Sequence, residues 1–209
     1  MDGERDLRER LVDAGVELVL EGGTASVGLR EIARRAGVSH GAPRRYFPTH
    51  RALLSAIARR GFEELGARAA AAVDGTAGAR EELAALARAY LAFALERRGM
   101  FELMFRHELL DGGRQEEVPD GPRLREATLP LLRHVTDLVA RCRGDAAEPS
   151  ATVTATALWA NLHGIAQLWS WGSLQLAFGE PGEPGGSGVG SPDRLIEAAL
   201  DAHLGPAAR

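Results

Sequence analysis

The segment from Leu29 to Leu54, LREIARRAGVSHGAPRRYFPTHRALL, constrains the fold of this chain more than any other. Ile32 and Ala33 are spaced to pack two short helices against each other. Gly37 stands where the first helix must end, because glycine adopts the left-handed backbone of a helix terminus at little cost. Ser39 then offers a side-chain oxygen to cap the second helix. The pattern predicts a helix-turn-helix whose second helix begins at Ser39.

The second helix of such a motif lies in the major groove of DNA, and this one carries suitable donors. His40, Arg44 and Arg45 can donate hydrogen bonds to base edges or phosphates. Residues 22–51 hold six arginines against one acid, a local charge of +5 in a chain whose net charge is −4. The rest of the chain therefore carries a charge of −9. A basic segment in an otherwise acidic protein, here residues 22–51 and called the basic island, is typical of a DNA-binding domain. The alternative is a charged helix face in solvent, but here the charges coincide with the turn.

Two parts of the sequence resemble the TetR family of transcriptional regulators. The part from about Arg5 to about Leu65 is similar to the family's N-terminal DNA-binding domain, through Ile32-Ala33, Ala36-Gly37-Val38-Ser39, Phe47 and Leu53-Leu54. Arg44 departs from the family, which usually has a tyrosine there, and His50 stands where a lysine is usual. Far downstream, Trp159-Ala160-Asn161-Leu162-His163-Gly164 is similar to the W-x-x-x-H-G signature of one class of C-terminal domains.

The resemblance implies a homodimeric repressor in the cytoplasm, which a small apolar ligand releases from DNA. One recognition helix from each subunit would enter successive major grooves of a near-palindromic operator. Arg44 and Arg45 would contact bases and phosphates. His40 would contact a base edge, and Arg30 a phosphate. The residues expected at the DNA-binding site are Arg30, Ser39, His40, Gly41, Ala42, Arg44, Arg45, Tyr46, Thr49 and His50.

The composition favours an all-α fold, because helix-forming residues are abundant and no strand-length run alternates between apolar and polar residues. We expect about nine helices in two domains. Residues 1–50 would form a three-helix DNA-binding domain, and residues 51–209 a larger ligand-binding and dimerisation domain. A helix over about 49–71 would bridge the two domains.

The segment from Ser150 to Gly179 contains no acidic or basic residue and is long enough to span a bilayer. It also holds polar residues such as Asn161 and Gln175 and lacks flanking basic residues, so burial against a second subunit fits it better. Near the C-terminus, an apolar stripe is formed by Leu195, Ile196, Ala199 and Leu200. We expect a homodimer through helices of about 150–178 and 192–203, and no membrane span.

The residues from Met100 to Phe105 form a dense cluster of methionine and phenylalanine, which pack adaptably around apolar ligands. Trp159 and His163 are four residues apart and share one helix face. The expected ligand-binding residues are Tyr90, Met100, Phe101, Met104, Phe105, Trp159, His163 and Gln167. For both groups the alternative is a plain hydrophobic core with a hydrogen-bonded structural histidine.

No motif predicts catalysis, so neither enzyme activity nor a cofactor is expected. The sequence has no phosphate-binding glycine loop, and His107, His134 and His163 lack the spacing of metal ligands. Two other functions stay open. One is a DNA-binding regulator without ligand control, and the other is a helical small-molecule carrier or enzyme.

Cys142 is the only cysteine, so no disulfide can form within the chain and a reducing compartment is the default. We expect Cys142 to be a small buried residue, with redox sensing as the alternative. The charged N-terminus lacks the apolar core of a signal peptide, which agrees with a cytoplasmic location.

Overall fold

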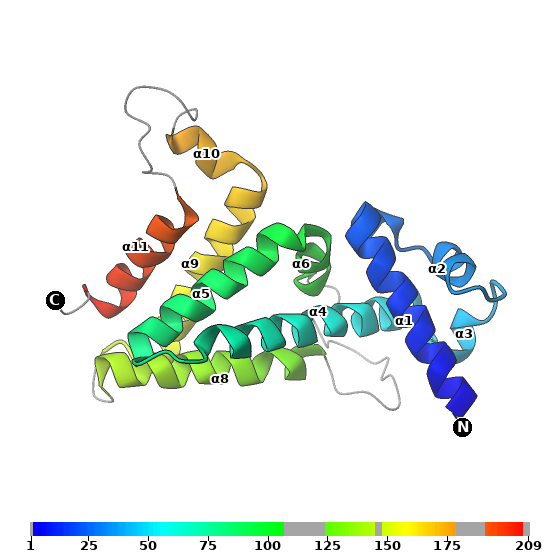
Figure 1. The fold of residues 1–209 in the computed structure, drawn as a ribbon, viewed down its shortest axis with the longest axis horizontal. Helices are drawn as coiled ribbons and strands as arrows, with labels where there is room; N and C mark the ends of the chain where they lie inside the picture. Colours follow the sequence, from blue (N-terminus) through cyan, green and yellow to red (C-terminus); the bar gives the residue numbers. More distant parts are fainter. Residues whose placement is uncertain (1, 107–123, 145–147, 179–190, 207–209) are drawn as a thin grey trace. The chain divides into compact units, whose positions relative to one another are not determined.

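The computed structural model describes residues 2–106, 124–144, 148–178 and 191–206, and its regular elements in these ranges are helices (Figure 1). The all-α expectation is confirmed for this part of the chain. None of the helices in these ranges has the length and hydropathy that crossing a bilayer requires. Backbone contacts divide the chain into two compact units, with unit 1 formed by Met1–Glu64 and Arg97–Leu129 and unit 2 by Leu65–Glu96 and Pro130–Arg209.

Unit 1 contains the expected helix-turn-helix. Its elements are α1 (Asp2–Gly22), the 3-10 helix η1 (Thr24–Ser26), α2 (Leu29–Arg35), α3 (Pro43–Tyr46), the first part of α4 (His50–Val73) and α6 (Arg98–Met104). Its fully buried side chains include Leu11 of α1, Ile32 of α2 and Leu53 of α4. Each large apolar side chain removed from water contributes about 1.5–3 kcal/mol, so these residues supply much of the stability of the unit.

The turn between α2 and α3 forms as predicted. Gly37 has a φ of 69°, in the left-handed region. Val38 N–H donates to the Ala33 carbonyl at 3.0 Å, and Gly37 N–H donates to the Arg34 carbonyl at 3.2 Å. This pair of bonds is the Schellman motif, which satisfies the last carbonyls of a helix and turns the chain away from it.

The helix after this turn is shorter than predicted. α3 begins at Pro43, and no side chain caps it. The Ser39 carbonyl accepts instead from Ala42 N–H at 2.9 Å, within a turn. Pro43 has no N–H to donate to the Ser39 carbonyl four residues earlier, while its fixed φ suits the first position of a helix. The prediction that Ser39 caps and starts the recognition helix is therefore wrong.

The start of α4 agrees with the sequence. Thr49 Oγ1 accepts a hydrogen bond from Ala52 N–H at 3.1 Å, which is the geometry of a threonine N-cap. The helix then runs without interruption over His50–Val73, where the sequence predicted about 49–71. Its residues up to Glu64 belong to unit 1, and those from Leu65 belong to unit 2.

Unit 2 holds the other helices. They are α5 (Ala79–Glu96), most of α8 (Leu124–Arg143), α9 (Ala151–Ser170), α10 (Ser173–Phe178) and α11 (Pro192–Leu204). The single helix expected over 150–178 is divided between α9 and α10. Gly172 has a φ of 76°, and its N–H donates to the Trp169 carbonyl at 3.0 Å, which ends α9 as a glycine usually ends a helix.

α11 packs against α5 and α9 in unit 2 (Figure 1). Three residues of its apolar stripe, Ile196, Ala199 and Leu200, are buried there. Arg80 of α5 also pairs with Asp201 of α11, which fixes the edge of the contact. The sequence suggested that this stripe needs a second subunit to cover it, but α5 and α9 already do so within the chain.

Candidate nucleic-acid interface

The recognition segment, residues 39–46, separates side chains that hold the fold from side chains that face solvent. Pro43 is buried, and so is Phe47 just after the segment. Arg44 and Arg45 are both exposed on α3. Of the expected DNA-binding residues, the exposed ones are Arg30, Ser39, His40, Gly41, Arg44, Arg45 and His50, and the half-buried ones are Ala42, Tyr46 and Thr49.

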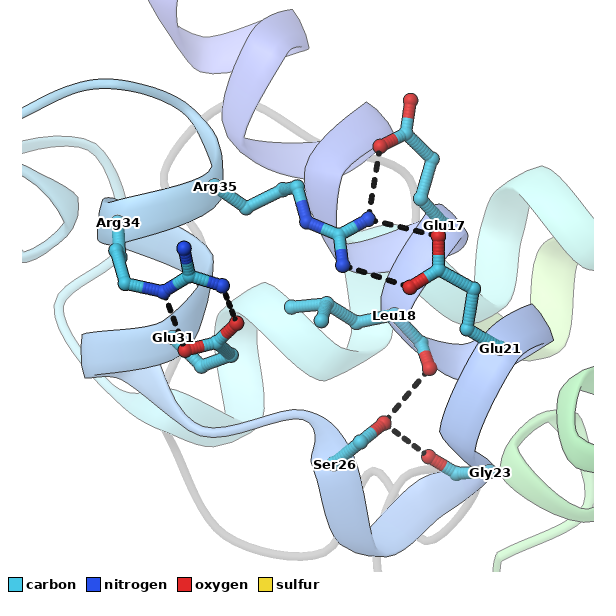
Figure 2. A network of polar contacts seen from close by, with 8 residues as sticks. All are labelled: Glu17, Leu18, Glu21, Gly23, Ser26, Glu31, Arg34 and Arg35. Atoms are coloured by element: carbon cyan, nitrogen blue, oxygen red, sulfur yellow. Dashed lines mark hydrogen bonds and ion pairs between the residues drawn. The ribbon is translucent and has the colours of Figure 1, made fainter.

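Two arginines of the basic island are paired with acids inside unit 1 (Figure 2). Arg35 of α2 binds Glu21 of α1 through two nitrogens, at 2.9 and 2.6 Å from the two carboxylate oxygens. The same guanidinium lies 3.3 Å from a carboxylate oxygen of Glu17. Arg34 pairs with Glu31, three residues earlier in α2. Hydrogen bonds from the arginines hold the pKa of the Glu21 and Glu31 carboxyls below their ordinary value.

Arg51 of α4 also interacts within the protein, so three of the six arginines remain for a partner outside the chain. In the ranges that the structure describes, no acid forms a salt bridge with Arg30, Arg44 or Arg45. Glu17 and Glu21 precede the basic island in the sequence, yet the fold brings them beside it. A count of charges along the chain therefore overstates the positive charge of this region.

One stripe of α1 holds the end of α2. Arg10, Glu17 and Glu21 follow one another at intervals of seven and four residues, so they lie on the same helix face. Arg10 Nη2 donates to the Ala36 carbonyl at 2.7 Å, just past the last turn of α2. Sequence reasoning missed these contacts, although the spacing of the three charged residues was a usable signal.

The connection from α1 to α2 is tied down by Ser26 (Figure 2). Its hydroxyl oxygen lies 2.7 Å from the Leu18 carbonyl and 2.7 Å from the Gly23 carbonyl. The single hydroxyl hydrogen is shared between these two acceptors. Ser26 thereby fixes η1 against the last turn of α1 and sets where α2 begins.

His50, which stands where the resemblance leads one to expect a lysine, contacts the protein's own backbone. Its Nε2 lies 2.7 Å from the Val27 carbonyl. A carbonyl only accepts, so Nε2 carries the hydrogen and donates it to the Val27 carbonyl. The contact joins the start of α4 to the segment before α2. Nε2 of His50 is therefore occupied within the protein and is not available to a phosphate.

The polar part of the expected ligand site lies in unit 2. Tyr90 of α5 and His163 Nδ1 of α9 are 2.7 Å apart, and the Trp159 ring centroid is 5.6 Å from that of His163. Trp159 also hydrogen-bonds Tyr90. An indole N–H can only donate, so it bonds the phenolic oxygen. The phenolic hydrogen then needs an acceptor and Nδ1 lies beside it, so we infer that Tyr90 donates to His163. Gln167, one turn further along α9, is half-buried.

Burial keeps this tyrosine and histidine uncharged. It raises the pKa of the Tyr90 phenol above its ordinary value. It also lowers the pKa of the His163 imidazole. In both cases the charged form would lose hydration that the protein does not replace.

The apolar part of the expected ligand site lies in unit 1. Met100, Phe101 and Met104 of α6 are buried there, and Phe105 is half-buried. α6 approaches Gly61 of α4 so closely that a Cβ at Gly61 would lie 2.5 Å from the Met104 sulfur. The structure thus brings the expected ligand residues together in two groups, one in each unit, and the α6 group is densely packed.

The remaining candidates from the sequence have ordinary surroundings. Cys142 of α8 is half-buried, and burial raises the pKa of its thiol. His134 Nε2 lies 2.9 Å from Glu82, and His163 bonds Tyr90. His107 lies outside the described residues.

Matches to known protein families cover both units of the chain. Residues 11–57 match the family described as bacterial regulatory proteins, tetR family. Residues 83–184 match the family described as Tetracyclin repressor-like, C-terminal domain. The first match contains α2, the turn at Gly37 and α3, and the second contains Tyr90, Trp159 and His163.

Relatives and solved structures agree with these matches. The HTH-type transcriptional repressor KstR of Mycolicibacterium smegmatis is 36% identical over 67 residues, which are 32% of this chain and 33% of KstR, so the match spans about a third of that relative. A structure of a protein of unknown function from Rhodococcus sp. RHA1 is 32% identical with a TM-score of 0.72, covering 95% of this chain and 93% of that one. The multidrug binding protein EbrR, solved with imidazole, is 25% identical with a TM-score of 0.57 and covers 97% of each chain.

Proposed function

The chain belongs to the TetR family of bacterial regulatory proteins, and we propose that it is a homodimeric transcriptional repressor that binds a near-palindromic operator. The observation that carries this proposal is the recognition segment, where Arg44 and Arg45 are exposed while Pro43 is buried. In a helix-turn-helix, side chains at these positions reach base edges in the major groove, and arginine binds guanine through two hydrogen bonds. KstR, which is similar to this chain over 67 residues, is by name a repressor.

The roles of single residues follow from their exposure. Arg44 and Arg45 are proposed to contact bases and phosphates, and His40 a base edge. Arg30, on the first turn of α2, is proposed to contact a phosphate. Gly41 is exposed and has nothing within 4 Å of where a Cβ would lie, so DNA can approach the backbone there.

A second subunit is proposed to cover the outward face of α9. This face carries no charge and exposes three large apolar side chains, Val153 and Leu168 of α9 and Trp171 just after it. Large apolar side chains exposed on one helix face are typical of protein interfaces. A two-fold axis there would give the dimer one recognition segment from each subunit. In helix-turn-helix dimers such a pair binds half-sites one turn of B-form DNA apart, about 34 Å.

A small, mostly apolar ligand is proposed to bind in unit 2 beside Tyr90, Trp159 and His163. A few polar groups in apolar surroundings orient such ligands. EbrR, a structural relative, is described as a multidrug binding protein. The buried α6 group is the less favoured part of the expected site, because its packing on Gly61 is already tight. The ligand would weaken operator binding only as far as it prefers the DNA-free form of the protein.

The test is selection of bound fragments from genomic DNA with the purified full chain, followed by affinity measurement on the enriched sequences. Enrichment of one near-palindromic sequence is expected, with tight binding that a scrambled sequence of equal length does not show. Uniform recovery of fragments would contradict sequence-specific regulation. In a second arm, small hydrophobic compounds are screened for thermal stabilisation together with release of the operator. Stabilisation without release, or no stabilisation by any compound, favours a regulator without ligand control.

A further inference from the structure

Arg35 occupies a different environment from the other arginines of the basic island. Its side chain is 27% exposed, against 66% for Arg34 beside it in sequence. Its guanidinium holds both oxygens of Glu21 and also reaches Glu17 (Figure 2). A planar guanidinium with two parallel hydrogen bonds to one carboxylate fixes the relative orientation of the two groups. Arg35 therefore fixes the last residue of α2 against α1.

Further hydrogen bonds hold the backbone of the two residues that follow Arg35. Arg10 holds the Ala36 carbonyl at 2.7 Å, and the turn at Gly37 is closed by its own backbone bonds. The recognition segment begins directly after that turn. The angle between α1 and α2 therefore determines the orientation of the recognition segment.

We propose that Arg35 is a positioning residue for operator binding, which acts through its bidentate pair with Glu21 and does not contact DNA. The pair holds α2 on α1, and thereby holds the recognition segment in the orientation that fits the major groove. This inference rests on the proposed DNA-binding function. It assigns to Arg35 a structural role within the protein, whereas Arg44 and Arg45 are proposed to contact DNA.

A phosphate contact by Arg35 is disfavoured by its neighbours. To reach a phosphate, Arg35 would have to leave Glu21 and Glu17. Two carboxylates would then stand near the DNA backbone without the cation that neutralises them, and like charges at short range repel. A second possibility is that Glu21 and Glu17 merely reduce the positive charge of the head. Substitution of Glu21 distinguishes this shielding from positioning, because the two roles predict effects of opposite sign.

The experiment measures operator affinity by fluorescence anisotropy at several salt concentrations for Arg35→Gln, Glu21→Gln and the charge swap Arg35→Glu with Glu21→Arg. Each single substitution is expected to weaken specific binding by about fivefold, the upper range for loss of a partly exposed ion pair. The salt dependence of binding should change by less than about half a unit of slope. The swap should restore affinity to within about twofold. Arg44→Gln is the control for a DNA contact, and it should lower the slope by about one.

Several results would overturn the proposal. A loss of slope of about one in Arg35→Gln, equal to that of Arg44→Gln, would make Arg35 a phosphate contact. Tighter binding by Glu21→Gln would make the acids a charge shield, and unchanged binding in both single variants would make the pair irrelevant. Circular dichroism and thermal unfolding check that each variant is folded. If Arg35→Gln does not fold, Glu21→Gln and the charge swap provide the test. If the unaltered protein binds no operator specifically, the proposed function itself fails, a result distinct from intact binding by all variants.

Discussion

The hydroxyl of Tyr90 on α5 and Nδ1 of His163 on α9 lie 2.7 Å apart, in a hydrogen bond that joins residues 73 positions apart in the sequence and in which Tyr90 is inferred to donate. The bond requires Nδ1 to be without a hydrogen, so the neutral ring carries its hydrogen on Nε2. Protonation of His163 would place a hydrogen on Nδ1 and turn the acceptor into a second donor. The contact between α5 and α9 therefore depends on the charge state of one imidazole.

The first prediction concerns pH. Burial makes the pKa of His163 lower in the folded chain than in the unfolded chain, where it is about 6.5. Between these two values the unfolded chain binds more protons, so stability rises with pH. The contribution of His163 is present above the unfolded value and is lost as pH falls through the folded value.

Urea unfolding between pH 8 and pH 5 measures this effect. His163→Gln is the matched control, because the glutamine oxygen can accept from Tyr90 but does not titrate in this range. The variant is expected to show a flatter dependence of stability on pH. The same slope below pH 7 in both proteins would show that His163 does not carry it.

The second prediction concerns the hydroxyl of Tyr90. Tyr90→Phe leaves the His163 acceptor and the Trp159 indole without this partner, so the free energy of unfolding should fall by about 1–2 kcal/mol. Tyr46→Phe is the control, because Tyr46 is half-buried and should change stability by less than about 0.5 kcal/mol. Urea unfolding of the two variants at pH 7.5 gives the comparison. Equal stability of both would show that the buried hydroxyl contributes nothing.

The third prediction concerns base and phosphate contacts. Arg44→Ala or Arg45→Ala should weaken operator binding by about 1–3 kcal/mol if the side chain reads a base edge, with relaxed preference at that base pair. If the side chain contacts a phosphate, the salt slope should fall by about one instead. Arg88→Ala, an arginine of α5 that pairs with Asp193 and Glu197, is the control for loss of a surface arginine. A folded double variant at Arg44 and Arg45 that binds as tightly as the unaltered protein would refute this site.

The fourth prediction compares two glycines. Gly37 has a φ of 69°, so Gly37→Ala should destabilise the protein by about 1 kcal/mol. Gly66 is exposed within α4 and has nothing within 4 Å of where a Cβ would lie. Gly66→Ala should therefore stabilise the protein by about 0.5–1 kcal/mol, because alanine favours the helix. Thermal unfolding should give shifts of opposite sign, and a shift of the same sign would contradict the backbone argument.

The fifth prediction concerns the homodimer. Val153→Glu and Trp171→Glu each place a charge on the outward apolar face of α9 and its end, and a buried unpaired charge is costly. Sedimentation at micromolar concentration should show monomers for these variants and dimers for the unaltered protein. Ala92→Glu, on an exposed part of α5, is the control and should leave the dimer intact. Dimers in both α9 variants would place the interface elsewhere.

Local features of the head were predictable, whereas contacts between distant segments were not. The Gly37 turn and the Thr49 cap depend on a few neighbouring residues, and both formed as expected. Pro43 was visible in the sequence too, but its effect on Ser39 depends on one missing hydrogen bond four residues away. The pairing of Arg35 with Glu21 lies outside any local count, because it depends on how α1 crosses α2.

The expected ligand site shows the same limit. Met100 and Phe105 follow α5 closely in sequence, so the pattern placed them in the C-terminal domain. The chain returns to unit 1 at Arg97, however, and α6 packs there. Tyr90 and His163 do lie together in unit 2. The resemblance had indicated the motif that holds Trp159 and His163, and this motif lies in the same unit as α5. Hydrophobic patterns showed which residues are buried, but not which unit buries them.

The division of labour in the recognition segment has an evolutionary consequence. Pro43 and, just after the segment, Phe47 are buried and stabilise the fold, whereas His40, Arg44 and Arg45 are exposed. Substitutions at such exposed positions usually change stability by less than about 0.5 kcal/mol. With the DNA contacts proposed above, a descendant of this protein could therefore acquire a new set of target genes by changing two or three codons, without compensating substitutions for stability.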